Sequence, residues 1–180
     1  LIGAYDSHRE TLKYDIGRGI LEALGSDVSV SEKDVLIRGN FSTVRNVGSK
    51  IIIDDRRAGR ITTDTNNRII KLLQSKINKI DGVGVEFTSG LEHRFVCKLK
   101  FKNKLNSSEV HILDTDPEEV GVAPLIPKNL NQKSQKVSKI VVKLVNLIRE
   151  TLKKEKKANY ALLRGFSIYP KIPTFEALYG

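Results

Sequence analysis

Apolar side chains that recur every three or four residues mark two long segments of this chain as amphipathic helices. The first segment begins at Thr62 or Thr63, either of which can cap a helix N-terminus, and ends at Asp81-Gly82. The second segment runs from about Gln132 to Lys157 and carries its lysines on another face. The two apolar stripes are Ile69, Ile70, Leu73, Ile77 and Ile80, and Val137, Ile140, Val141, Leu144, Ile148 and Leu152.

Runs of β-branched and alternating residues predict strands between and after these helices. Residues 35–44 and 49–55 flank the turn residues 46–48 and so predict a hairpin. In the segment 92–102, Phe95, Cys97, Leu99 and Phe101 alternate with more polar neighbours, as in a strand with one buried face. The other predicted strands are 83–88, 109–113 and 160–163, the last ending at Arg164-Gly165.

The order of these elements predicts the fold class. A short helix over 18–24, closed by Gly25, precedes two strands, a helix, three strands, a helix and a strand. Such an order predicts an α+β fold in which helices pack against a mixed, largely antiparallel sheet. Residues 114–131 contain three prolines and little periodicity, so they predict a long loop of the kind that often carries function.

Composition places the chain among soluble globular proteins, since 39% of its 180 residues are apolar and 29% are charged. No apolar run reaches the length of a membrane-spanning helix, and no signal peptide opens the chain. Cys97 is the single cysteine, which excludes an internal disulfide and predicts a reducing, cytoplasmic setting. The chain begins at Leu1 within an apolar run, without an initiator methionine, and stops at Tyr179-Gly180 just after a predicted helix start, so we expect an internal piece of a longer protein.

The net charge of +10 raises the possibility of a nucleic-acid partner. The segment 128–157 holds ten Lys or Arg and two acidic residues, which leaves only +2 for the rest of the chain. No aromatic residues that could stack on bases are interleaved with these lysines. The ordinary explanation, a charged outer face on an amphipathic helix, is therefore favoured over nucleic-acid binding.

The densest candidate site is Asp54-Asp55-Arg56-Arg57-Ala58-Gly59-Arg60, at the end of a predicted strand. Guanidiniums form paired hydrogen bonds to phosphate or carboxylate and stay charged, while the adjacent carboxylates can fix their orientation. If the strand continued, Arg56 and Arg57 would point to opposite faces and only one would face the site. The alternative is a solvated strand end with local ion pairs.

Three further clusters carry weaker signals. His93 beside Arg94 suits phosphate binding or proton transfer near neutral pH, although a lone histidine is more often structural. Asp114-Thr115-Asp116-Pro117 suits either a hard cation or a turn that caps its own backbone, and the turn is favoured. His8 and His111 have no supporting neighbours. The chain shows no Gly-rich phosphate loop, no Gly-x-Ser-x-Gly, no Cys/His metal spacing and no evident nucleophile.

Six motifs in this order extend over nearly the whole chain: Gly17-Arg18-Gly19 with Glu22-Ala23-Leu24-Gly25; Ile37-Arg38-Gly39-Asn40-Phe41; Asp55-Arg56-Arg57-Ala58-Gly59-Arg60-Ile61; Glu92-His93-Arg94; Asp114-Thr115-Asp116-Pro117; and Leu162-Leu163-Arg164-Gly165. Together they resemble the archaeal-type cofactor-independent phosphoglycerate mutases of the alkaline phosphatase superfamily. Asp-Arg-Arg-Ala-Gly-Arg is the most specific of them, and the others are weak singly but strong as an ordered set.

The resemblance implies a metal-dependent enzyme that interconverts 3-phosphoglycerate and 2-phosphoglycerate through a phosphoserine, without bisphosphoglycerate. The nucleophilic serine lies upstream of Leu1 in such enzymes, and two divalent ions, manganese or magnesium, are bound outside this piece, so this chain alone should be inactive. The implied division is residues 1–33 as the tail of a core segment, 34–156 as an inserted substrate-gripping domain, and 157–180 as the return into an α/β phosphatase-like core. The implied substrate-binding residues are Arg57, Arg60, His93, Arg94, Arg38, Arg18 and Arg164.

Two other functions compete with this interpretation. A basic nucleic-acid-binding module would use the helix within 128–157 and would bind oligonucleotides with a steep dependence on salt. A purely structural domain would use its arginines in surface ion pairs and would not be protected by phosphoglycerate. Oligomeric state is open at this level.

Overall fold

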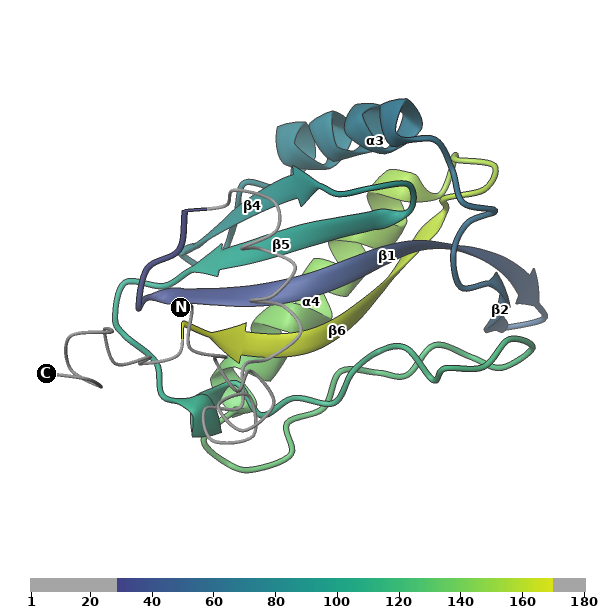
Figure 1. Ribbon diagram of the computed structural model, residues 1–180. Helices are drawn as coiled ribbons and strands as arrows, with labels where there is room; N and C mark the ends of the chain where they lie inside the picture. The colour runs from purple at the N-terminus through teal and green to yellow at the C-terminus, as the bar shows by residue number, and fades with distance from the viewer. Residues whose placement is uncertain (1–28, 170–180) are drawn as a thin grey trace, which may run out of the picture.

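The computed structural model describes residues 29–169, which form one antiparallel sheet with two α-helices packed on it (Figure 1). This confirms the predicted α+β class. No helix among residues 29–169 is long and apolar enough to cross a membrane. The predicted helix over 18–24 and Arg18 lie outside the described residues. The elements are β1 (Asp34–Val47), β2 (Lys50–Asp55), α3 (Thr63–Lys76), β3 (Lys79–Ile80), β4 (Val83–Ser89), β5 (Arg94–Lys100), the 3-10 turn η1 (Ser107–Glu109), α4 (Gln135–Leu152) and β6 (Tyr160–Ile168).

Strand β1 organises the sheet, whose order is β2-β1-β5-β4-β3 with β6 also paired to β1. The first part of β1 pairs with β5 and β6, and the part after Ser42 pairs with β2 as the predicted hairpin. The ladder shifts register between Thr43 and Val44. Since β6 pairs with β1 along most of its length, residues 160–168 belong to the same sheet as residues 34–47.

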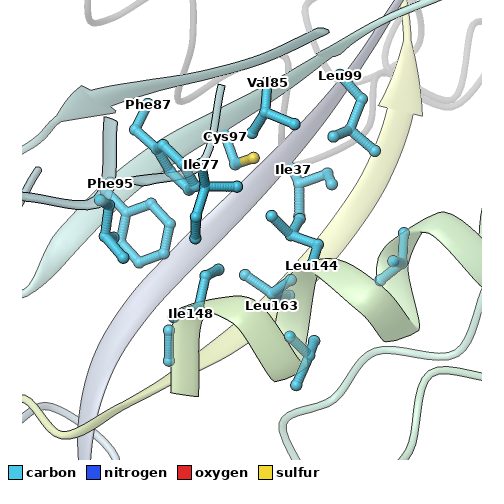
Figure 2. Close-up of a cluster of buried hydrophobic side chains, with 14 of the residues drawn as sticks. Ile37, Ile77, Val85, Phe87, Phe95, Cys97, Leu99, Leu144, Ile148 and Leu163 are labelled. Carbon is cyan, nitrogen blue, oxygen red and sulfur yellow. The ribbon is translucent and has the colours of Figure 1, made fainter. Parts of the chain in front are cut away.

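The core lies between the sheet and the two helices, and Figure 2 shows Leu144 and Ile148 of α4 beside Ile37 and Leu163. Helix α3 begins where predicted, because the Thr62 hydroxyl accepts a hydrogen bond from the Thr65 amide. Cys97 is fully buried in this core, and burial raises the pKa of its thiol well above the ordinary value. The thiol is therefore protonated at neutral pH and is a packing group.

Four predicted boundaries were wrong. Helix α3 ends at Lys76 and not at Asp81-Gly82, and Ile80 belongs to strand β3. Residues 109–113 are not a sheet strand, because their backbone pairs with the loop at 128–130 through Leu113 N–H to Lys128 O and Leu130 N–H to His111 O. Strand β6 does not end at Arg164-Gly165 but continues to Ile168 along β1. Helix α4 spans Gln135–Leu152, whereas its apolar periodicity predicted a helix from about Gln132 to Lys157.

Gly39 of β1 lies directly opposite Phe95 of β5. A Cβ at this position would lie 2.1 Å from the Phe95 ring, which stacks on Phe41 with ring centroids 4.6 Å apart. We expect Gly39→Ala to lower the free energy of unfolding of the full-length protein by about 2 kcal/mol, because the fully buried Phe95 has no room to move away. Urea denaturation measures the loss.

Gly84→Ala is the matched control for Gly39→Ala. Gly84 also lies in a strand, and a Cβ there would meet the Lys100 Cβ at 3.3 Å, next to a flexible exposed side chain. We expect this change to alter stability by less than about 1 kcal/mol. Equal losses in the two variants would contradict the role given to Gly39.

Candidate functional site

The sheet face away from the helices carries charged side chains on its central strands. Arg38 of β1 is directly opposite Arg164 of β6, and Asn40 of β1 is directly opposite Arg94 of β5. Residues opposite each other in an antiparallel pair, and residues two apart on one strand, point to the same face. The register therefore gathers these four side chains on one face, opposite to that of the core residue Ile37.

The turn after β2 adds three more guanidiniums. The Asp55 carboxylate accepts hydrogen bonds from the amides of Arg57 at 2.7 Å and Gly59 at 2.5 Å. Ala58, Gly59 and Arg60 all have positive φ angles, of 50°, 62° and 49°. A left-handed conformation costs free energy in residues other than glycine, and such strain is concentrated at functional sites.

Strand β2 ends at Asp55, so the premise that Arg56 and Arg57 alternate along a strand was wrong. Both side chains line one cavity of 540 Å³. Its lining residues are Arg38, Asn40, Arg56, Arg57, Arg60, Leu91, Glu92, His93, Arg94 and Arg164. The structure thus brings together every substrate-binding candidate from the sequence that lies within residues 29–169, while their role in binding stays a prediction.

Two of these arginines are fixed by carboxylates. Arg56 makes a two-pronged ion pair with Asp116, at 2.9 Å to each oxygen. Arg164 contacts the same carboxylate at 3.2 Å, and it also pairs with Glu118. These contacts join the turn after β2, the loop at 114–118 and strand β6 around one buried anion.

Asp116 is the anchor of this arrangement, and none of its side chain is exposed. Burial acts to raise the pKa of its carboxyl, but the hydrogen bonds from Arg56 and the Glu118 amide, together with the charges of Arg56 and Arg164, lower that pKa below the ordinary value. The Asp116 carboxylate also accepts a hydrogen bond from the Glu118 amide at 2.9 Å, so the Asp114-Thr115-Asp116-Pro117 motif caps its own backbone while the same carboxylate holds two arginines. Asp114 accepts a hydrogen bond from the Gly165 amide at 2.9 Å.

Three other arginines of the cavity have no such partner. Within residues 29–169, no carboxylate lies within 4 Å of the guanidiniums of Arg57, Arg60 or Arg94, and all three residues are exposed. Glu92 is the single carboxylate among the lining residues. The cavity therefore presents an excess of positive charge, with fixed arginines in one part of its wall and unpaired arginines in another.

His93 lies at the wall of this cavity and is 5% exposed. Burial lowers the pKa of its imidazole, the positive charges of Arg94, Arg57 and Arg60 lower it further, and Glu92 opposes the shift. The imidazole is therefore neutral at pH 7. Its Nδ1 lies 3.7 Å from a carboxylate oxygen of Glu92.

Asn66 was missed by sequence reasoning because it stands in an ordinary polar first turn of α3. The residue is fully buried, and its side-chain amide donates to the backbone carbonyls of Glu92 and Arg94, both at 2.6 Å. Glu92 has a positive φ of 53°, which is a strained backbone conformation. By binding the carbonyls before and after His93, Asn66 stabilises the strained turn that carries the histidine. No local pattern distinguishes a helix asparagine with such a distant partner.

The described residues contain no group of three or more His, Cys, Asp or Glu side chains placed to hold a metal ion. The arginine cavity is suited to an anion, since guanidiniums donate hydrogen bonds and do not ligate cations. The lysines of α4 lie elsewhere: Lys136, Lys139 and Lys143 are exposed, and Lys143 pairs with Asp81 at 2.5 Å.

Comparison with known proteins gives consistent results. A family model described as 2,3-bisphosphoglycerate-independent phosphoglycerate mutase matches residues 9–158. The chain is 48% identical over 171 residues to a probable 2,3-bisphosphoglycerate-independent phosphoglycerate mutase of Aquifex aeolicus, covering 95% of this chain and 42% of that protein. It is 44% identical over 170 residues to the protein of the same description in Thermotoga maritima, covering 94% of this chain and 40% of that protein.

A solved structure has a similar fold. The cofactor-independent phosphoglycerate mutase from Thermoplasma acidophilum superposes with a TM-score of 0.76 and 24% identity, over 93% of this chain and 46% of that one. At this identity the likeness shows the fold alone. The chain spans about two fifths of the length of the curated relatives it matches.

Proposed function

Since the chain belongs to the family of 2,3-bisphosphoglycerate-independent phosphoglycerate mutases, we propose that the whole protein interconverts 3-phosphoglycerate and 2-phosphoglycerate, and that the arginine cavity binds the substrate. The observation that carries this proposal is the cavity itself, with six arginines and one carboxylate in its wall. A volume of 540 Å³ is in the range of small-molecule sites. Family membership favours this substrate over a nucleic acid bound by α4.

The two kinds of arginine have different roles in the proposal. Arg57, Arg60 and Arg94 have no carboxylate partners among residues 29–169, so a phosphate or carboxylate can bind them without breaking an ion pair. Arg56 and Arg164 are already held by Asp116, and they form a fixed wall that needs no rearrangement on binding. Arg38, opposite Arg164 in the sheet, adds charge to the same wall.

Substrate grip is the part of the reaction that these residues are suited to perform. In a mutase the glycerate must stay bound while it re-orients between giving up and regaining its phosphoryl group. Several guanidiniums in a cavity can hold the glycerate carboxylate while the molecule re-orients and shield it from water. The nucleophilic serine, its phosphoserine intermediate and divalent ions are proposed for other parts of the whole protein.

The proposal includes the division of the chain into residues 1–33, 34–156 and 157–180, with the middle part inserted in a phosphatase-like core. Strand β6 lies beyond residue 156 and pairs with β1, and in this proposal its Arg164 contributes to substrate binding from the segment assigned to the return into the core. A cytoplasmic setting, as predicted from the single cysteine, belongs to the same proposal.

A coupled phosphoglycerate mutase assay on the full-length protein tests the proposal, with manganese added and no bisphosphoglycerate. We expect activity that a chelator removes and that manganese or magnesium restores, because phosphoryl transfer in this proposal depends on divalent ions. Absence of activity with every divalent metal tried would contradict the mutase assignment.

A further inference from the structure

His93 differs in kind from the arginines of the cavity wall. Arginine side chains can only donate hydrogen bonds. A ligand composed of anionic oxygens alone is satisfied by such donors and has no hydrogen of its own to offer. His93 is a buried, neutral ring among them, so its contribution to the wall is not a positive charge.

The surroundings of the ring determine which nitrogen carries the hydrogen. Nδ1 is buried and makes no hydrogen bond to residues 29–169, and its nearest anion is the Glu92 carboxylate oxygen at 3.7 Å. A lone pair on Nδ1 would face this negative charge, whereas an N–H there is attracted to it. The neutral ring therefore keeps its hydrogen on Nδ1, and Nε2 on the other edge has a free lone pair.

A second acceptor lies on the same wall. The side-chain oxygen of Asn40 is buried without a hydrogen-bond partner among the described residues, and Asn40 lines the cavity from β1. The backbone N–H of the next residue, Phe41, donates to the His93 carbonyl at 2.8 Å, so the two side chains come from adjacent positions on paired strands. Buried acceptors without partners are unfavourable unless a ligand supplies the donor.

From this geometry we propose that His93 is a specificity-determining residue, whose Nε2 accepts a hydrogen bond from a hydroxyl group of the anion bound by the arginines. The inference rests on the proposed function and adds a property of the ligand: the site selects a phosphorylated acid that carries a free hydroxyl. Both phosphoglycerates carry one. An analogue without the hydroxyl would leave the acceptor unpaired in a desolvated wall, and it would bind more weakly.

The test compares the binding of two ligands to the full-length protein, 3-phosphoglycerate and 3-phosphooxypropanoate, which differs from 3-phosphoglycerate only in lacking the hydroxyl. Binding of both ligands is measured by calorimetry without added metal, so that the phosphoglycerate is not converted during the measurement. We expect the wild type to bind the hydroxylated ligand about tenfold more tightly.

His93→Leu removes the acceptor and His93→Gln retains an oxygen that can accept. We expect the ratio of the two affinities to fall to near one in the leucine variant, with the affinity for 3-phosphooxypropanoate changed less than about threefold, and to recover in part in the glutamine variant. Thermal denaturation of both variants checks that they fold. Glu92→Gln, which removes the charge that fixes the ring hydrogen, should reduce the ratio to an intermediate value.

Other outcomes overturn the inference. An equal loss of affinity for both ligands in His93→Leu would mean that the ring only supports the site. An unchanged ratio of the two affinities would mean that His93 does not bind the hydroxyl. If the wild type binds both ligands equally but catalyses the mutase reaction, the hydroxyl contact is contradicted and the proposed function is not. If the wild type binds neither ligand and has no activity, both the hydroxyl contact and the proposed function are contradicted.

Discussion

Arg60→Ala in the full-length protein is expected to lower kcat/KM for phosphoglycerate about 100-fold. Arg60 lines the cavity and has no carboxylate partner among residues 29–169, so its hydrogen bonds are available to the ligand. A hydrogen bond to a charged group contributes up to about 3 kcal/mol, and 1.4 kcal/mol corresponds to a factor of ten in rate. The coupled mutase assay measures the loss, and Arg57→Ala should show a comparable effect.

Arg45→Ala is the matched control for this prediction. Arg45 is an exposed arginine of β1 that pairs with Asp54 at 2.7 Å and does not line the cavity. An exposed ion pair contributes less than about 1 kcal/mol to stability, so its loss should leave the kinetics close to those of the wild type. Near-normal kinetics for Arg60→Ala, with a folded protein, would remove Arg60 from the site.

Asp116→Asn is expected to destabilise the full-length protein by about 3 kcal/mol, because removing one partner of a buried ion pair leaves the other charge uncompensated. Asp116 is fully buried at the side chain and binds both Arg56 and Arg164, which are partly buried. Urea denaturation at pH 7 measures the effect. Asp54→Asn, at an exposed carboxylate paired with Arg45, should cost less than about 1 kcal/mol.

The same carboxylate predicts a dependence of stability on pH. The folded-state pKa of Asp116 is lowered, so its stabilisation is fully present above the ordinary pKa of an aspartate and is lost as the pH falls through the lowered value. Asp116→Asn should therefore lose less stability than the wild type between neutral and acidic pH. Parallel losses in the two proteins would show that Asp116 does not contribute in this range.

Much of the fold followed from local patterns. Periodicity and capping residues predicted both helices, and the hairpin of β1 and β2 followed from β-branched runs around a turn. The segment 109–113 failed because buried apolar residues such as Val110 and Ile112 suit a packed loop as well as a strand. Strand β6 was predicted too short because Arg164-Gly165 interrupts the apolar run, although backbone pairing with β1 does not require apolar side chains.

The candidate site was predicted residue by residue but not as an arrangement. Arg57, Arg60, His93 and Arg94 were recognised from short motifs, because guanidinium and imidazole chemistry depends on residue type. That these residues share one cavity depends on the register of three strands and on a left-handed turn. Neither feature has a signature in the motifs themselves.

By itself the sequence determined the α+β class and the family, and it predicted an anionic ligand for the arginines. Local periodicity, ordered motifs and the cluster of Arg56, Arg57 and Arg60 are properties of neighbouring residues, so they can be recognised without knowledge of the fold. Only the tertiary structure decided which arginines are fixed and which are unpaired, because Asp116 reaches Arg56 and Arg164 across 60 and 48 positions of the chain. It likewise decided that Asn66 supports the His93 turn, since a buried amide and the carbonyls it binds meet only when helix α3 packs on the sheet.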